Sequence, residues 1–329
     1  MSGRALNLSL LGASAAAILA ACLLGSVPLP PARLLAALFG GGEPGDAVVV
    51  WAIRLPRALA AFIVGVGLGA SGAALQGLLR NPLAEPGVLG VSASAALAAT
   101  FTLYYGLAAA APWLLPLAAV AGALAATMLI ALVAMRSASM VTLVLVGVAL
   151  SSFAGALMAL LMNLAPNPFS LSDMVSWMLG SVANRSFDDL ALAAPFMLSG
   201  LAILFLNRRG LSALTLGEEA AAGVGLDLRR QRLLVVLGAG LVTGASVAVA
   251  GAIGFVGIVA PHLVRPRVGH DPARGLLPSA LLGGLFLVLA DIGVRVLPTD
   301  AELKLGVVAA LVGAPVFALI AASARKVAR

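Results

Sequence analysis

Long apolar runs, separated by short polar segments, make up most of the chain. Strands of a membrane β-barrel alternate apolar and polar residues over about ten positions, and these runs do not alternate. Each long run is instead sufficient to cross the roughly 30 Å hydrocarbon core as a helix. The pattern predicts an all-α, polytopic integral membrane protein with about ten transmembrane helices per subunit, in a single transmembrane domain over residues 1–329. The predicted spans are 8–27, 55–79, 88–110, 112–134, 140–163, 190–207, 233–250, 252–266, 276–297 and 305–323.

Two of these runs are ambiguous. The run 252–266 is shorter than the others, so we predict that it combines with its neighbour or is partly re-entrant. In the first run, Leu19–Cys22 reads LAAC, which looks like a lipoprotein cleavage box. Because the apolar run continues past Cys22 to about Val27, we expect an uncleaved first span.

Composition agrees with a membrane location. Hydrophobic residues make up 62% of the chain and charged residues only 10%, whereas ordinary soluble domains have about 25% charged residues. The net charge of +7 comes mostly from arginines at the ends of the apolar runs. These arginines indicate orientation in the bilayer and not nucleic-acid binding. An N-terminus on the inner side places most Lys and Arg in the cytoplasm, and an even number of spans returns the C-terminus there.

Residues that perform chemistry are scarce. The chain has one cysteine and two histidines, so we predict no internal disulfide, no metal site and no catalytic residue. The sequence has no G-x-x-x-x-G-K-[ST] motif, and we therefore expect no cofactor and no ATP bound by a P-loop in this chain. A membrane-embedded enzyme would need clustered His, Asp, Glu or Cys. An ion-coupled secondary transporter, the main alternative, would need ionisable groups near the midplane, where Asp291 and Arg295 are the nearest cases.

Small residues recur along the second run. Gly65, Gly69 and Gly72 follow one another at spacings that favour close helix packing. The stretch GLGASG formally matches a dinucleotide-binding motif, but it lies inside a span with no preceding strand, so we reject that interpretation. Arg54–Leu75 also resembles Leu228–Ile253, with arginines, an apolar run and then Gly-Ala-Ser. Since the two copies enter from opposite sides, the sequence predicts an inverted internal repeat.

The polar segment 211–232 interrupts two apolar runs and includes two glutamates and several arginines. Thr215 and Glu218 have the spacing of a capping box, which predicts a short helix. We expect that helix to end at two glycines and Asp227 to cap the next helix. A solvated loop is the alternative, but it would expose several apolar residues that are better buried against a partner. These residues are Leu214, Leu216, Val224, Leu226 and Leu228.

Four blocks of sequence resemble one family. The stretch LGEEAAAGVGLD resembles the coupling loop of bacterial ABC-importer permeases. Arg54–Ser92 is similar to the second-span motif of the FecCD/BtuC-type permeases, which serve iron-siderophore, haem and cobalamin ABC importers. Gly254–Arg265 and Ala301–Ile320 match two further blocks of that family, in the expected order. The resemblance begins at about residue 45, and it departs at Lys304-Leu305, where many members have Pro-Val.

The resemblance implies a transport role with several partners. A second copy of the chain would form a homodimer around a central pathway in the bacterial inner membrane. Two ATP-binding subunits, which bind ATP and Mg, would lie on the cytoplasmic side, and a periplasmic substrate-binding protein would deliver a metal chelate. We favour a ferric siderophore, with haem or cobalamin possible. The segment 211–232 would be the ATPase-coupling segment, through Thr215, Gly217, Glu218, Glu219, Ala220, Gly223 and Gly225.

Three outer arginines match family positions that receive acidic groups of the binding protein. They are Arg54, Arg57 and Arg295. Charge-assisted bonds at such sites orient a partner. The alternatives are interfacial snorkelling for the first two, and a local i,i+4 pair with Asp291 for the third.

Other polar and aromatic residues have structural interpretations. We predict that Glu85 is solvated or paired with Arg80, and that Trp113 and Trp177 are interface anchors. Residues 174–190 are expected to form an amphipathic segment on the outer side.

Overall fold

The chain folds almost entirely into helices. The computed structural model describes residues 3–25, 29–136, 139–297 and 302–327, and it contains no strand within these ranges. The all-α prediction is confirmed. Among the described residues, seven helices are long and apolar enough to cross a membrane. They are α1 (Gly3–Leu23), α4 (Leu55–Leu79), α7 (Leu114–Arg136), α8 (Met140–Asn163), α10 (Phe187–Leu206), α13 (Leu228–Ala250) and α15 (Pro272–Val296).

Three further helices occupy the remaining predicted spans. They are α5 (Val91–Tyr104), α14 (Val256–Val264) and α16 (Leu305–Val327). The nine residues of α14 extend about 14 Å, so this helix is too short to cross, as the length of its run suggests. The helix predicted over about 88–110 is present as α5, which begins three residues later than predicted. Residues 86–89 form a 3₁₀ turn that ends at Gly90, whose φ is +75°, and α5 begins only after it.

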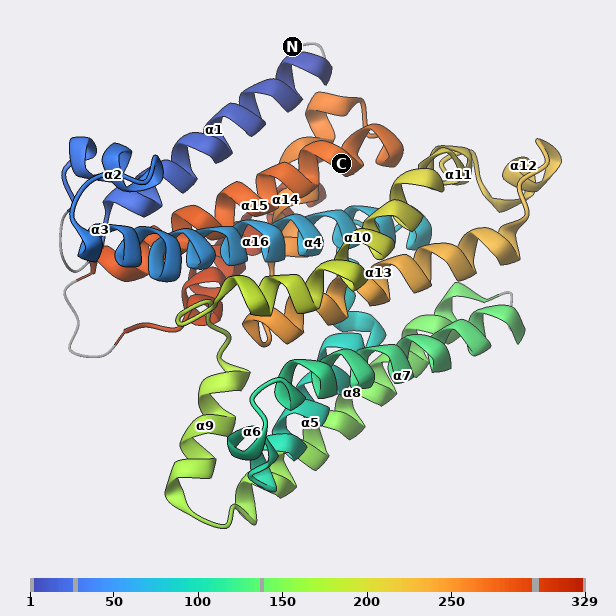
Figure 1. The fold of residues 1–329 in the computed structure, drawn as a ribbon. Helices are drawn as coiled ribbons and strands as arrows, with labels where there is room; N and C mark the ends of the chain where they lie inside the picture. Colours follow the sequence, from blue (N-terminus) through green and yellow to red (C-terminus); the bar gives the residue numbers. More distant parts are fainter. Residues whose placement is uncertain (1–2, 26–28, 137–138, 298–301, 328–329) are drawn as a thin grey trace.

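Short helices fill the connections and mark the two ends of the bundle. Figure 1 shows α2 (Pro31–Leu38) and α3 (Pro44–Val48) at one end, and α11 (Arg208–Leu214) and α12 (Glu218–Gly223) at the other. The π-helix η1 (Val49–Arg54) joins α3 to α4. Two more, α6 (Leu107–Ala110) and α9 (Pro168–Met178), lie at the same end as the lower tips of α7 and α8 (Figure 1).

Helix α4 occupies the centre of the fold. It packs against α15, α13 and α14, and α13 packs in turn against α7 and α10. In Figure 1, α4 begins beside α3 whereas α13 begins beside α12, so the two helices run in opposite directions. Their sequences are the two copies of the predicted repeat, and this antiparallel pairing is the relation that an inverted repeat requires.

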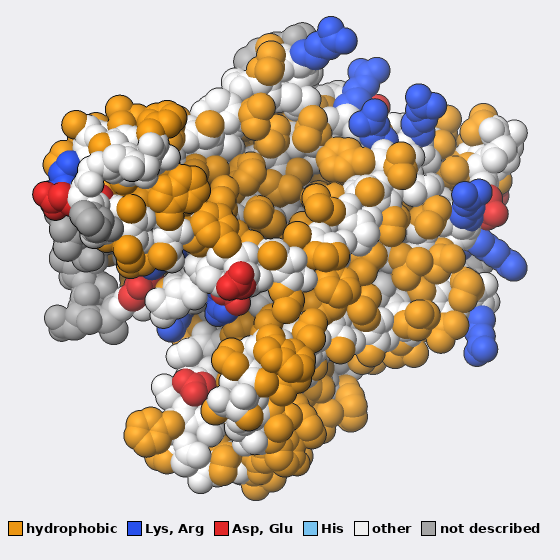
Figure 2. Space-filling view, in the orientation of Figure 1, with side chains coloured by type: hydrophobic (Ala, Val, Ile, Leu, Met, Phe, Trp, Pro, Cys, Tyr) orange, Lys and Arg blue, Asp and Glu red, His pale blue; other side chains and the backbone are white. Residues whose placement is uncertain are grey.

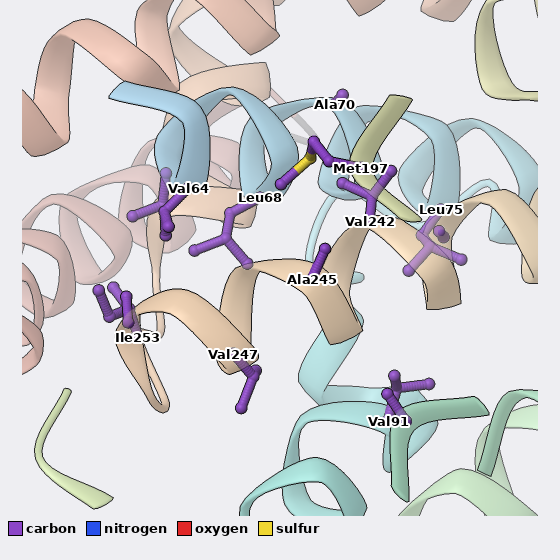
Figure 3. Close-up of a cluster of buried hydrophobic side chains, with 14 of the residues drawn as sticks. Val64, Leu68, Ala70, Leu75, Val91, Met197, Val242, Ala245, Val247 and Ile253 are labelled. Carbon is purple, nitrogen blue, oxygen red and sulfur yellow. The ribbon is translucent and has the colours of Figure 1, made fainter. Parts of the chain in front are cut away.

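The core between these helices consists of small and branched apolar side chains. Figure 3 shows Val64, Leu68 and Leu75 of α4 facing Val242 and Ala245 of α13. All five side chains are at most 4% exposed. Tight packing of this kind, and not hydrophobicity relative to lipid, holds helices together in a bilayer.

Glycines bring the backbones of α4 and its neighbours into contact. A Cβ at Gly65 would lie 2.2 Å from the carbonyl oxygen of Gly283 in α15, and one at Gly69 would lie 2.3 Å from that of Ser279. At Gly72 the nearest atom would be the carbonyl oxygen of Gly257 in α14, at 2.0 Å. The predicted small-residue packing face is confirmed.

Replacing Gly72 with alanine is expected to destabilise the fold. The new methyl group would overlap the α14 backbone, and overpacking of this kind costs about 1–3 kcal/mol or more. The apparent midpoint of thermal unfolding in detergent, followed by size-exclusion chromatography, should fall. Gly12→Ala is the matched control, because a Cβ at Gly12 in α1 meets nothing within 4 Å. Equal midpoints for the two variants would contradict this packing.

Candidate functional site

The polar segment 211–232 forms helix, turn, helix. Helix α11 leads into a turn at 215–217, α12 follows, and a second turn leads into α13. In Figure 1 this segment projects from one end of the bundle. Helix α12 ends at Gly223, and Gly225 has φ +89°, which confirms the glycine-rich end. Asp227 caps α13 as predicted, because its Oδ1 accepts a 3.0 Å hydrogen bond from the backbone N–H of Arg230.

The predicted capping box at Thr215 is wrong. The N-cap of α12 is Gly217, with φ +100° and no side-chain cap hydrogen bond. Thr215 instead ends α11, and its hydroxyl donates to the carbonyl oxygen of Ser212 at 2.6 Å. The positive φ favours glycine, so the chain turns one residue before the glutamates and both glutamates fall in the first helical turn.

An ion pair anchors α12 to the membrane-spanning α13. The Glu218 carboxylate lies 2.8 Å from the guanidinium of Arg232, which is 4% exposed. Ala221, on the same side of α12, is buried in the main core. Arg232 is therefore part of this site, although the sequence grouped it only with arginines that indicate orientation. Its role depends on α12 folding back onto α13, which no local pattern shows.

The outward face of the segment carries both apolar and charged side chains, and the charged ones include Glu219, Asp227 and Arg229. Leu216 is 67% exposed and Val224 is 70% exposed. Of the five apolar residues predicted to lie against a partner, Leu214 is buried within the chain itself and Leu226 and Leu228 are partly covered by the core. Leu216 and Val224 are thus the two of these five residues that the fold leaves exposed.

The outer arginines converge on the end of α1. Arg54 donates 2.9 Å hydrogen bonds to the carbonyl oxygens of Cys22 and Leu23, and Arg295 donates a 3.0 Å bond to that of Ala21. The last carbonyls of a helix lack intrahelical partners and carry partial negative charge. Both guanidinium groups therefore stabilise the C-terminal end of α1.

Asp291 joins two of these arginines. Its side chain is 1% exposed and lies 2.8 Å from Arg57 and 2.9 Å from Arg295, four residues later in α15. Arg57 also pairs with Glu302. The alternative interpretation, a local pair between Asp291 and Arg295, is confirmed. That the three arginines also receive acidic groups of a binding protein stays a prediction.

The two ends of the bundle differ in charge. Figure 2 shows Lys and Arg side chains gathered along the edge that carries the start of α1, α11 and α12 in Figure 1. This asymmetry is the one that sets orientation in a bilayer. The projecting segment lies on the basic side.

Two structural interpretations from the sequence need correction. Glu85 does not pair with Arg80 within the described residues; its Oε2 accepts a 3.4 Å bond from the N–H of Phe255, just before α14. Trp177 is not an exposed interface anchor, since only 8% of it is accessible. Trp113 is 55% exposed, as an anchor requires.

Comparison with known proteins agrees with this architecture. The model of the FecCD transport family matches residues 13–323. The chain belongs to this family. A FecCD-type permease is a transport protein, and the resemblance inferred from the sequence is confirmed.

Individual relatives cover most of the chain. The ABC transporter permease protein YvrB of Bacillus subtilis (strain 168) is 41% identical over 287 residues, which is 85% of this chain and 80% of YvrB. The vitamin B12 import system permease protein BtuC of Salmonella typhi is 40% identical over 281 residues, 83% of this chain and 85% of BtuC. An inward-facing structure of a metal-chelate type ABC transporter superposes with a TM-score of 0.85 at 29% identity. It covers 97% of this FecCD chain and 99% of its own.

Proposed function

We propose that this chain is the membrane-spanning subunit of an ATP-driven importer that carries a metal chelate or cobalamin inward across the bacterial inner membrane. It acts as a homodimer with two ATP-binding subunits, which hold ATP and Mg, on the side of α12. A periplasmic binding protein delivers the cargo at the opposite end. Both termini lie in the cytoplasm.

The projecting segment carries this proposal. It presents Leu216 and Val224 to the outside, while Glu218 ties it to a buried arginine of a spanning helix. A partner that grips α12 therefore acts on α13 directly. A transporter that is driven by another subunit needs such a segment to transmit the movement of that subunit. A secondary transporter has no driving subunit and does not need one.

Relatives narrow the cargo to a chemical class. The BtuC relatives favour cobalamin, and the solved relative favours a metal chelate more generally. A ferric siderophore, favoured from the sequence, remains within this class. Selection among these cargoes rests chiefly with the binding protein.

Transport by the reconstituted system is the direct test. The chain, its ATP-binding subunit and its binding protein are placed in proteoliposomes, and uptake of labelled cobalamin and of a labelled ferric siderophore is measured. We expect uptake of one of them only with ATP on the side of α12, and none with an ATP-binding subunit that binds but does not hydrolyse ATP. Uptake driven by an ion gradient without that subunit would identify a secondary transporter instead.

A further inference from the structure

A polar cavity opens near the end of the bundle opposite α12. It has a volume of about 410 Å³, within the usual range of small-molecule sites. Helix α9 and the loop that leads to α10 form one side, and the start of α16 forms another. The polar side chains in its described lining are Asp173, Ser176, Trp177, Ser181, Asn184, Arg185 and Lys304.

Arg185 lies in this cavity wall without a carboxylate partner. Its guanidinium carbon is 5.5 Å from the centre of the Trp177 ring, and among the described residues no acid lies within 4 Å of it. Its Nε is buried and has no hydrogen-bond partner. Burial lowers the pKa of Arg185, an effect partly offset by the charge of Asp189. An arginine side chain still remains protonated at neutral pH.

Trp177 adds a neutral donor at the same wall. The residue is 8% exposed, and its indole N–H is buried without a hydrogen-bond partner. Buried donors are nearly always paired in folded proteins. Arg185 and Trp177 therefore stack on each other in the cavity wall, each with one buried, unpaired donor atom.

Lys304 supplies a second cation. It lines the cavity just before α16. The amide of Gly306 donates to the carbonyl oxygen of Gly180 at 3.2 Å. This bond holds the start of α16, and with it Lys304, beside the loop that contains Arg185. Lys304 has no ion pair within the described part of the chain.

The acids near the cavity do not neutralise both cations. Asp173 is the one carboxylate in the described lining. Asp189 is engaged elsewhere, since its Oδ2 accepts bonds from the amide and hydroxyl of Ser186 at the start of α10. The described lining therefore carries two positive charges and one negative charge, which favours an anionic ligand.

We propose that this cavity is a subsite for a carboxylate or phosphate group of the cargo. Arg185 and Lys304 neutralise the group, and Arg185 offers the forked donor geometry that suits carboxylate and phosphate oxygens. The Trp177 ring packs against the Arg185 guanidinium and holds it in the cavity wall. The identity of the cargo rests on the proposed function, whereas anion binding at the cavity is measurable without partners.

Trp177 makes the binding observable. The purified full-length chain, with Trp51→Phe and Trp113→Phe, is placed in phosphatidylcholine nanodiscs and titrated with citrate and with pyrophosphate while fluorescence is followed. We expect a saturable change with at least one anion and none with glycerol. Arg185→Gln and Lys304→Gln should each weaken the affinity roughly tenfold or more. Arg33→Gln, which removes an outer charge outside the cavity, should leave it unchanged.

Each result of this titration supports or overturns the subsite. No saturable change, or equal affinities for Lys304→Gln and the Arg33 control, would overturn the proposal, even if Arg185→Gln fails to fold. Loss of the response when phosphatidylglycerol replaces part of the lipid would assign the site to a lipid headgroup and overturn the assignment to cargo. Anion binding without ATP-driven uptake would leave the subsite standing and remove the proposed function. ATP-driven uptake without anion binding would overturn the subsite and leave the proposed function standing.

Discussion

Replacing Leu216 and Val224 together with aspartate is expected to abolish assembly with the ATP-binding subunits. Both side chains project from the fold, at 67% and 70% exposure. Central apolar anchors of an interface are each worth about 2 kcal/mol or more when truncated, and carboxylates would also have to be desolvated there. Affinity for the ATP-binding subunit should therefore fall at least about 30-fold. Co-purification and ATP-driven uptake measure this loss.

The double variant should insert and fold normally. Substitutions at exposed positions usually change stability by about 0.5 kcal/mol or less, so the elution profile of the chain alone should match that of the wild type. Arg136→Gln changes an exposed charge at the C-terminal end of α7 and serves as the control with normal assembly. Normal uptake by the Leu216/Val224 variant would show that the partner grips another surface.

Replacing Asp291 with alanine is expected to destabilise the protein more than any other single change considered. The carboxylate is 1% exposed and lies between the guanidinium groups of Arg57 and Arg295. Removal leaves Arg295 without an ion-pair partner among the described residues, and leaves Arg57 paired only with Glu302. Breaking a buried pair in this way costs about 3–5 kcal/mol. Unfolding in a denaturing detergent series measures the loss.

A second aspartate provides the comparison. Asp188, in the first turn of α10, is exposed, and its replacement with alanine removes only a helix-dipole interaction of about 0.3–1 kcal/mol. Similar losses for Asp188→Ala and Asp291→Ala would mean that water, and not Asp291, compensates the outer arginines.

Sequence periodicity and composition predict most of the fold. Seven long helices, the glycine face of α4 and the Asp227 cap depend on residues close together in sequence, and local patterns predicted each of them. The start of the third run was placed three residues early, also for a local reason. Gly90 adopts a left-handed conformation, and apolar content alone does not show that a turn precedes α5.

The sequence predicts where the candidate site lies, but it does not predict the contacts that residues distant in sequence make there. The coupling segment has a recognisable composition, but Arg232 joins it through a contact across 14 residues. Arg54 reaches the end of α1 across 32 residues, so nothing near it in sequence distinguishes a helix-capping arginine from a docking one. Thr215 shows the opposite error. Its spacing to Glu218 permits a capping box, but the backbone at Gly217 supplied a turn that made the cap unnecessary.

Helix α13 runs from the segment that contains α12 to the cavity lined by Arg185. Its 23 residues extend about 35 Å, and no loop interrupts them. Near one end is Arg232, which holds α12; at the other end the carbonyl oxygen of Ala250 accepts a 2.7 Å bond from the amide of Ser181, on the rim of the outer cavity. A stiff rod of this length transmits a small tilt at the α12 end as a displacement at the cavity end. In the importer proposed above, this one helix would therefore couple ATP hydrolysis to cargo entry.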